Sequence, residues 1–437
     1  MNDFDTVDFF TSGGAVAQDP YPFFEYLRAK GPVYREPQRG VVVVTGYQEA
    51  IALFDDHRNF SSCNGVTGPF PGLPFEPEGD DISGQIEQYR DQMACNEFLV
   101  TQDRPSHTAG RALLMRLFTP ARLKTVEGMM VRLSDQLIDE LCRRRSCELV
   151  SDYAHPFATL VIADLIGVPS ADRDMFRKTL SRQWEECSDR NKSLLNRETL
   201  KQPLEFLKDQ FSLYLEERRQ RPRQDILTEL INTRLPDGTT AGTAELLKVA
   251  TFLFAAGQDT SSVLIASALK YLGENPELQQ RLRDDRDLIP KFIDEVLRLE
   301  SPVKSVFRLS RVPAMVGDLK VPAGTAVMIL PGAANRDPRR FPEPDKLLLD
   351  RPLGYEHLSF GHGIHTCAGR YLARAETRVT IERMLDRLAE IKISTGRHGL
   401  PGAYSYEYDS TYILRKLNSL YLEFSQVPPQ NLESKAS

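Results

Sequence analysis

The sequence lacks any run of apolar residues long enough to cross a membrane. One of its longest apolar runs covers residues 159–163, far below the ~18 residues that a membrane span needs. The N-terminus reads Met-Asn-Asp-Phe-Asp and has neither the basic nor the apolar segment of a secretion signal. We therefore expect a cytoplasmic protein without a membrane anchor.

Cysteine is scarce and shows no spacing typical of a metal site. The 437 residues include six cysteines: Cys63, Cys95, Cys142, Cys147, Cys187 and Cys367. Cys142 and Cys147 are separated by four residues and have no second pair nearby, so they do not match a zinc signature. Unpaired thiols fit a reducing compartment.

Linkers, repeats of fixed period and an excess of positive charge are also missing. Because no Gly/Ser tract or Pro-rich run divides the chain, we expect one domain over residues 1–437, with flexible ends at 1–18 and 426–437. The Pro/Gly-rich stretch 65–79 indicates a long functional loop. The net charge of −6 and the pI near 5.8 argue against nucleic acid as a partner.

The patterns that are present are mostly helical. Apolar residues recur with the 3.6-residue period through most of residues 111–290, and a further helical pattern covers 23–27. Short β-branched or apolar runs between turn residues predict strands at 41–44, within 314–330, and at 411–414 and 420–424. The predicted fold class is mainly α with small β-sheets.

The strongest chemical signal is the segment Phe-Gly-His-Gly-Ile-His-Thr-Cys-Ala-Gly at residues 360–369. Gly361 and Gly363 permit backbone angles that other residues avoid, and a helical stretch follows. Peptide N–H groups and the helix N-terminus would then point at Cys367, lower its pKa and hold a thiolate as a metal ligand. Taken alone, Cys367 would favour a buried structural cysteine.

This segment resembles the haem-binding loop of the cytochrome P450 family, Phe-Gly-x-Gly-x-His-x-Cys-x-Gly, at every fixed position. The resemblance implies a helix-rich, triangular fold and a haem b whose axial ligand, and only protein metal ligand, is the thiolate of Cys367. The other loop residues that it implies as cofactor contacts are Phe360, Gly361, His365 and Gly369.

A long helix is predicted over residues 244–272, with a glycine, an acid and a hydroxyl at its middle. Gly257 costs about 1 kcal/mol in a helix interior relative to alanine, which favours a kink or a widened groove there. The stretch resembles the family motif that crosses the distal haem face. By that resemblance Asp259 and Thr260 relay protons to bound dioxygen, and small Ala256 leaves room above the iron. Phe252 and Ala255 would line the substrate pocket, although ordinary core packing explains Phe252 equally well.

A second helix carries Glu295 and Arg298, which are neighbours on one face. Such pairs are commonly surface decoration. Here the pair resembles the family's Glu-x-x-Arg, whose third partner is an arginine at the position of Arg351. The role implied is structural, because this triad would lock the loop of Cys367. Before Arg351 the chain departs from the family's Asp-x-Phe-Asp pattern: apolar bulk is kept and the acid is lost. The motif Asn-Arg-Asp-Pro at 335–338 matches well.

A haem carries two propionates, so its pocket needs cations or hydrogen-bond donors at the rim. Family position assigns this role to four residues: His107, Arg111, Arg308 and His365. Satisfied polar residues or solvated charges explain each of them singly. The loop 63–97, the strand 303–307 with Val306 and Phe307, and the turn 404–410 are expected to flank an apolar substrate pocket.

The resemblance covers almost the whole chain and implies a bacterial-type monooxygenase. Such an enzyme inserts one oxygen atom of O2 into a C–H bond of a small hydrophobic substrate. No flavin or iron–sulfur domain is evident, so a ferredoxin with an NAD(P)H-dependent ferredoxin reductase is the expected donor, and we expect a monomer. A basic patch that could dock the donor is predicted at four residues: Arg116, Lys124, Arg370 and Arg374; a solvated helix face is the alternative.

Two rival hypotheses remain open at this stage. One is an enzyme of the same fold that uses peroxide or couples carbons, and the other is a non-catalytic haem-binding sensor. The intact pair Asp259 and Thr260 favours the monooxygenase, because neither rival needs an acid–alcohol pair.

Overall fold

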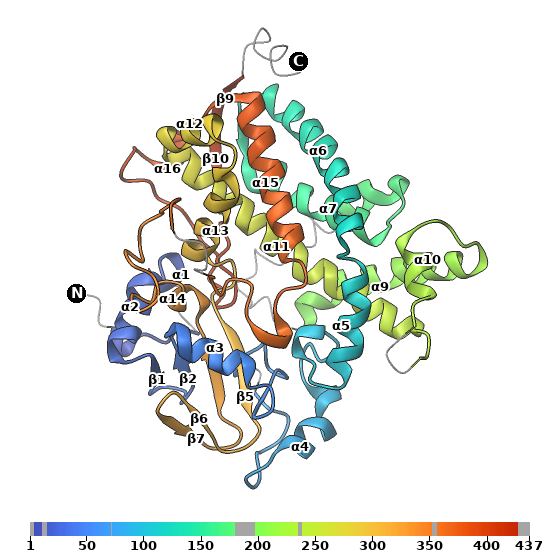
Figure 1. Cartoon of the computed structure of the whole chain (residues 1–437), viewed down its shortest axis with the longest axis vertical. Coiled ribbons are helices and arrows are strands. Elements are labelled where there is room, and N and C mark those ends of the chain that lie inside the picture. Colours follow the sequence, from blue (N-terminus) through green and yellow to red (C-terminus); the bar gives the residue numbers. More distant parts are fainter. Residues whose placement is uncertain are drawn as a thin grey trace.

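The computed structural model describes residues 4–10, 15–70, 72–179, 197–234, 238–351 and 356–426. Its longer helices fill one part of the molecule, and the main sheet lies beside them (Figure 1). The helices are α1 (Ala15–Gln18), α2 (Tyr21–Lys30), α3 (Tyr47–Asp55), α4 (Ser83–Gln88), α5 (Ser106–Arg116), α6 (Pro120–Cys142), α7 (His155–Ile166), α9 (Arg197–Gln220), α10 (Ile226–Ile231), α11 (Thr243–Glu274), α12 (Pro276–Asp284), α13 (Leu288–Glu300), α14 (Pro331–Ala334), α15 (Arg370–Arg387) and α16 (Thr395–His398).

Helix α11 runs through the centre of the helical part and packs against α7, α15, α9 and α13. The residues that it buries repeat around most of its circumference, as expected for a helix enclosed by others. By length and composition alone, α11 could cross a membrane, but 72% of its most apolar stretch is buried inside the protein. The hydrophobicity of α11 therefore serves the core.

The strands form three sheets within the described residues. The largest has the order β1-β2-β8-β5-β3; β2 and β8 are parallel, and its other neighbours are antiparallel. The second has the order β4-β10-β9, and β6 pairs with β7. The strands are β1 (Val33–Arg35), β2 (Val42–Val44), β3 (Phe60–Ser61), β4 (Ser146–Glu148), β5 (Val306–Ser310), β6 (Ala314–Val316), β7 (Leu319–Val321), β8 (Ala326–Ile329), β9 (Leu388–Ile393) and β10 (Tyr421–Gln426).

Two sequence expectations differ from the structure near the chain ends. Residues 411–414 do not form a strand, because bends at 412 and 413 interrupt the extended backbone, and Leu414 makes only an isolated bridge to Val303. The expected flexible arm at 1–18 includes Phe9 and Val16, which are buried against α2 and the sheet. The expected tail lies outside the described residues except for Gln426, which ends β10.

The loop predicted between residues 63 and 97 covers one face of the main sheet. It contains the short helix α4, and the backbone of Gly65 accepts a hydrogen bond from Phe307 N of β5 at 3.0 Å. At the far end of the loop, the ring of Phe98 packs 5.9 Å from that of Phe252 on α11. The loop therefore bridges the sheet and the central helix.

Candidate active site

The loop of residues 360–369 folds so that Cys367 is held just before helix α15. Cys367 N donates to Phe360 O at 2.8 Å, and Gly361 and Gly363 both adopt φ +67°. A Cβ on Gly363 would lie 2.8 Å from Phe54 O, so this position needs glycine for both its angle and its close approach to α3. The peptide N–H of Gly369 donates to the Cys367 thiol.

The electrostatics of Cys367 differ from the sequence expectation of a lowered pKa. Burial raises the pKa of the Cys367 thiol, and this effect outweighs the Gly369 N–H and the guanidinium groups of Arg111, Arg370 and Arg374, which lower the pKa. A thiol in such a place is chemically quiet until a cation draws off its proton. The surroundings therefore suit a metal ligand better than a free nucleophile.

The three residues predicted as a structural triad are in contact with one another through Glu295. Glu295 accepts from Arg298 Nε at 2.8 Å and from Arg351 Nε at 3.0 Å. Its second oxygen also accepts from Leu348 N at 2.9 Å. Arg298 is almost fully buried and donates to three backbone carbonyls: Asn335 O, Pro344 O and Lys346 O. The loss of the family's acid before Arg351 leaves this contact intact.

Asn335 connects the triad to the loop itself. Its amide donates to the hydroxyls of Ser301 and Ser359, both at 2.8 Å, and its oxygen accepts from Leu358 N at 2.6 Å. Ser359 directly precedes the loop, and its hydroxyl donates to Leu297 O of α13. A buried polar network with all its partners present is rigid, so α13 fixes where the loop begins.

The four residues predicted at the propionates also gather. The rings of His107 and His365 lie 4.2 Å apart, and His365 Nε2 contacts Ser62 Oγ at 3.0 Å. Burial lowers the pKa of His107 to about 4 and that of His365 to about 2, so both are neutral hydrogen-bonding groups near pH 7. Arg111 and Arg308 keep their charge, although burial lowers the pKa of Arg308 to about 10.

This cluster has more donors than acceptors. His107 Nε2 is buried without a partner. Neither Arg111 nor Arg308 makes an ion pair with any described residue; Arg308 donates only to the backbone oxygen of Phe307. Buried cations are normally neutralised by an anion. The cluster therefore fits the two propionates of a haem beside Cys367. Within the described residues no group of three His, Cys, Asp or Glu could hold a metal ion.

The predicted acid–alcohol pair, Asp259 and Thr260, lies near the middle of α11. Thr260 Oγ1 donates to Ala256 O at 2.9 Å, a bond that can bend a helix. Asp259 is buried, its Oδ1 has no partner, and burial raises its pKa. The adjacent positions Ala255 and Ala256 are only half-buried, although most of the helix around them is buried. This face of α11 therefore borders accessible space.

Sequence reasoning missed the buried carboxyl of Glu376 on α15. Ser261, which follows Thr260, donates to Glu376 Oε2 at 2.5 Å, whereas Oε1 has no partner. Burial raises the pKa of Glu376 to about 8. The sequence carries little signal for this burial. Glu376 lies among charged residues after the Cys367 loop, and such residues usually indicate an exposed surface.

The two residues predicted from β5 as substrate contacts point to opposite faces. Adjacent residues of a strand alternate. Phe307 is fully buried, and its ring packs near Phe10 and Tyr412, whereas half-buried Val306 shares the face of Arg308. The structure therefore separates Phe307 from the α11 residues, and the expectation for Phe307 is corrected. Phe252, the predicted pocket residue on α11, packs against the ring of Phe98.

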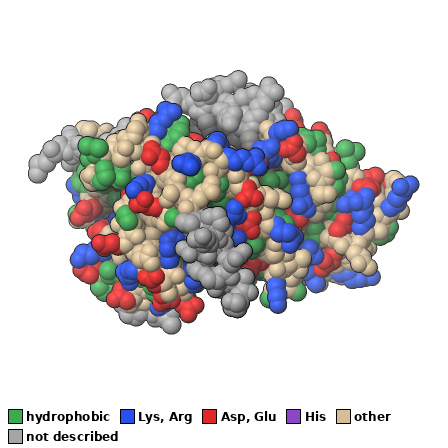
Figure 2. Space-filling view, turned by 90° about the horizontal axis from the view of Figure 1, so that it is seen from above, with side chains coloured by type: hydrophobic (Ala, Val, Ile, Leu, Met, Phe, Trp, Pro, Cys, Tyr) green, Lys and Arg blue, Asp and Glu red, His purple; other side chains and the backbone are tan. Residues whose placement is uncertain are grey.

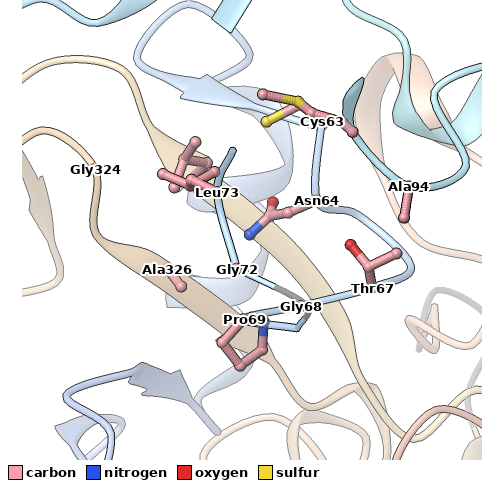
Figure 3. A pocket seen from close by; sticks show the side chains of 12 residues that line it. Cys63, Asn64, Thr67, Gly68, Pro69, Gly72, Leu73, Ala94, Gly324 and Ala326 are labelled. Carbon is pink, nitrogen blue, oxygen red and sulfur yellow. The ribbon is translucent and has the colours of Figure 1, made fainter. Parts of the chain in front are cut away.

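A cavity of about 180 Å³ lies under the 63–97 loop (Figure 3). Leu309 and Ala326 line it, so it is on the Phe307 face of the sheet and not on the Arg308 face. The side chain of Asn64 points into it (Figure 3), and Asn64 Oδ1 has no partner. This cavity is separate from the cluster around Cys367.

Comparisons with known proteins agree with this geometry. The family described as Cytochrome P450 matches residues 76–392. Cytochrome P450 109 of Bacillus spizizenii is 30% identical over 85% of both chains, and the cytochrome P450 monooxygenase PikC of Streptomyces venezuelae is 30% identical over 87% of this chain and 86% of its own. The substrate-free structure of cytochrome P450 CYP150A6 from Mycobacterium marinum is 48% identical, with a TM-score of 0.91, and covers 97% of this chain and 100% of its own.

The chain belongs to the cytochrome P450 family and has its helix-rich fold. It is therefore a haem monooxygenase of bacterial type, and in this family a cysteine thiolate binds the haem iron. The family fixes the reaction class.

Proposed function

We propose that this enzyme holds haem b through the Cys367 thiolate and hydroxylates a small, largely apolar substrate with electrons from a ferredoxin. One observation supports this most strongly. Arg111 and Arg308 are cations without an anionic partner among the described residues, in the same cluster as His107 and His365, and Arg111 also lies near Cys367. A single thiol beside two unneutralised cations is the set of groups that a haem with two propionates requires.

When bound, haem supplies the activation of O2 and the transfer of oxygen. Cys367 would hold the iron and donate electron density to it. Arg111 and Arg308 would bind the propionates, with His107 and His365 as neutral donors. Phe360 and Gly361 shape the loop, and Gly369, beside the sulfur, gives its N–H to Cys367. The triad of Glu295, Arg298 and Arg351 would fix the loop from below.

Asp259 and Thr260 would supply protons. Because burial raises the pKa of Asp259 and its Oδ1 is unpartnered, that oxygen can hold a proton inside the protein. Thr260 Oγ1, the neighbouring hydroxyl, would present the proton to dioxygen. Ala256 keeps the space beside Thr260 open. Phe252, Ala255 and Val306 would contact the substrate and exclude water.

The donor surface would lie around the N-terminus of α15 and along α5 and α6. Arg116 and Lys124 are exposed and form no ion pair with a described residue. Arg370 stacks on Tyr371, and Arg374 pairs with Asp294. The exposed side chains of Met115 and Tyr371 lie among these cations. Basic groups around apolar contacts suit an acidic partner such as a ferredoxin. The face in Figure 2 mixes both signs of charge.

The test uses the holoenzyme with a surrogate ferredoxin, its reductase and NADPH. Compounds that shift the haem spin state are first selected as substrates, and turnover is then run under ¹⁸O2. We expect one ¹⁸O atom in the hydroxylated product and dependence on the ferredoxin. Equal product from peroxide without NADPH would indicate a peroxygenase, and ligand binding without any product would indicate a sensor.

A further inference from the structure

The side chain of Lys304 is a buried cation that the proposed haem site does not use. Lys304 is 3% exposed, and its ammonium makes no hydrogen bond or ion pair with any described residue; only its backbone N is bonded there, to Ile413 O at 2.7 Å. Lysine is almost never buried unless it is paired. Burial lowers the pKa of Lys304 to about 8, so it is still largely protonated at pH 7.

The tip of Lys304 reaches accessible space. Lys304 Nζ is not among the fully buried polar atoms that lack a partner, although the residue as a whole is buried. Lysine commonly buries its methylenes and keeps its ammonium toward accessible space, and Lys304 is arranged in this way. An ammonium that touches a small accessible space without a protein partner is placed to meet an anion.

The position of Lys304 along its segment gives the side on which that space lies. Counting back from β5 in steps of two, Lys304 falls on the side of Val306 and Arg308. It is four residues from Arg308, about 13 Å for an extended chain. The propionate cluster therefore lies at one end of this row, and Lys304 lies at the other, beyond Val306.

The charged neighbours of Lys304 locate it further. Arg415 lowers the pKa of Lys304, and Asp409 raises it. Asp409 also raises the pKa of Asp259 on α11, so Lys304 and the acid of α11 have a neighbour in common. Arg415 is itself bound to Glu300 at 2.8 Å, and Asp409 makes no ion pair with Lys304 within the described residues. Among the residues that the structure describes, no carboxylate therefore neutralises the ammonium.

We infer that Lys304 is a carboxylate-binding site at the edge of the substrate pocket, and that the substrate is an apolar molecule bearing an acid group. This inference rests on the proposed function, because it assumes that the haem lies between α11 and the row of side chains formed by Lys304, Val306 and Arg308. A charge-assisted contact would fix one end of the substrate and leave its apolar part against Phe252 and Ala255. The carboxylate would set which carbon faces the iron.

The experiment compares matched acids and alcohols as ligands of the holoenzyme. Three pairs are titrated by the haem spin-state shift: dodecanoic acid with dodecan-1-ol, 4-phenylbutanoic acid with 4-phenylbutan-1-ol, and a monocyclic terpenoid acid with its alcohol. We expect at least one acid to bind about tenfold or more tightly than its alcohol. Lys304→Met should remove that preference and leave the affinity for the alcohol unchanged. Lys304→Arg should restore most of it. Lys320→Met, an exposed lysine on β7, is the matched control.

Three outcomes would overturn the inference. The wild type could bind none of the acids more tightly than their alcohols. Lys304→Met could weaken acid and alcohol equally, which would indicate a packing role. Lys304→Met could also lower haem content and keep the acid preference, which would make Lys304 a propionate ligand. Each variant is first reduced under carbon monoxide. An absent thiolate spectrum in the wild type would refute the proposed function, whereas a normal spectrum without acid preference would refute this inference alone.

Discussion

At the scale of single residues, the chemistry depends on groups that the protein keeps away from water. Asp259 and Glu376 are both buried carboxyls with raised pKa values and one unpartnered oxygen each. Asp259 directly precedes Thr260 and Ser261 on α11, and Glu376 of α15 contacts Ser261. The hydroxyls of Thr260 and Ser261 have different partners. Thr260 bonds its own helix, and Ser261 bonds α15. These differences lead to separate predictions for the two sites.

Thr260→Val removes the hydroxyl and keeps the shape of the side chain. We expect product formed per NADPH to fall about tenfold or more, with hydrogen peroxide released instead, because a positioned proton donor is lost. Substrate affinity should change less than twofold. The control is Thr251→Val on the same helix, whose hydroxyl bonds Leu247 O. The relay role of Thr260 is refuted if both variants stay equally coupled.

Glu376→Gln tests the buried carboxyl through stability. The folded-state pKa of Glu376, about 8, lies above its ordinary value of 4.5. The stability it contributes is therefore fully present below pH 4.5 and lost as pH rises through 8. We expect the wild type to lose roughly 3 kcal/mol from this group between pH 5 and pH 8, and Glu376→Gln to be spared that loss. Thermal unfolding of both proteins across this range measures it; parallel curves would contradict it.

The sequence allowed some of these residues to be predicted and concealed others. The Cys367 loop is recognisable because its glycines and ligand are neighbours in the chain, so local rules determine it. Glu376 and Lys304 were not singled out for burial, since a charged residue in isolation indicates a surface. Phe307 is expected in the substrate pocket, but the alternation of side chains along β5 places it on the face opposite to Val306 and Arg308.

At the scale of elements, the packing of α11 against α7 explains a residue that the sequence left ambiguous. Gly257 lies inside α11, which is helical throughout Thr243–Glu274. A Cβ on Gly257 would lie 2.7 Å from Ile162 Cδ1 of α7. The glycine therefore permits close contact between two helices, a long-range requirement that local patterns do not reveal.

Gly257→Ala should consequently change the stability of the protein by less than about 1 kcal/mol, because the gain in helix propensity is offset by the shift that the new Cβ forces on Ile162 Cδ1, the mobile end of its side chain. Ile162→Val removes the methyl that the new Cβ would meet. We expect Gly257→Ala to be stabilising in this background, so that the double variant is more stable than Ile162→Val alone. Chemical denaturation of the four proteins completes the cycle. Additive effects would show that Gly257 is needed for some other reason.

Element prediction otherwise succeeded where periodicity is long, and it missed four strands: β1, β3 and β4, which are short, and the six-residue β9. The central helix was predicted within two residues at each end, and strands β2 and β10 within one or two. Strand β4 was not predicted, because three residues between helices carry too little pattern. The segment 411–414 has strand composition, but it finds a partner only at one bridge.

At the scale of the whole molecule, paired carboxylates hold distant parts of the chain together. Arg298 and Arg351 keep the pKa of Glu295 below its ordinary value despite burial, and Lys270 and Arg415 do the same for Glu300. Groups with lowered folded pKa values contribute stability that is present above about pH 4.5 and lost as pH falls. We expect thermal stability to fall steeply below pH 4.5, and Glu295→Gln to show a smaller loss there but about 3 kcal/mol less stability at pH 7. An unchanged acid profile would refute this.

The donor surface gives a second prediction at this scale. Arg116→Glu should raise the KM for a ferredoxin several-fold, more at low salt than at high salt, because exposed charges steer association. The kcat at saturating ferredoxin should change little. Lys320→Glu on β7, which lies apart from α5 in the lower left of Figure 1, is the control. Equal effects from both variants would mean that net charge alone is responsible.

The central claim is that Cys367 holds a haem, and the absorption spectrum of the reduced holoenzyme under carbon monoxide tests it most directly. A strongly red-shifted main haem band in the wild type, lost in Cys367→His, is the predicted result. A band at the ordinary imidazole-type position in the wild type, or the same red-shifted band in Cys367→His, would contradict the account.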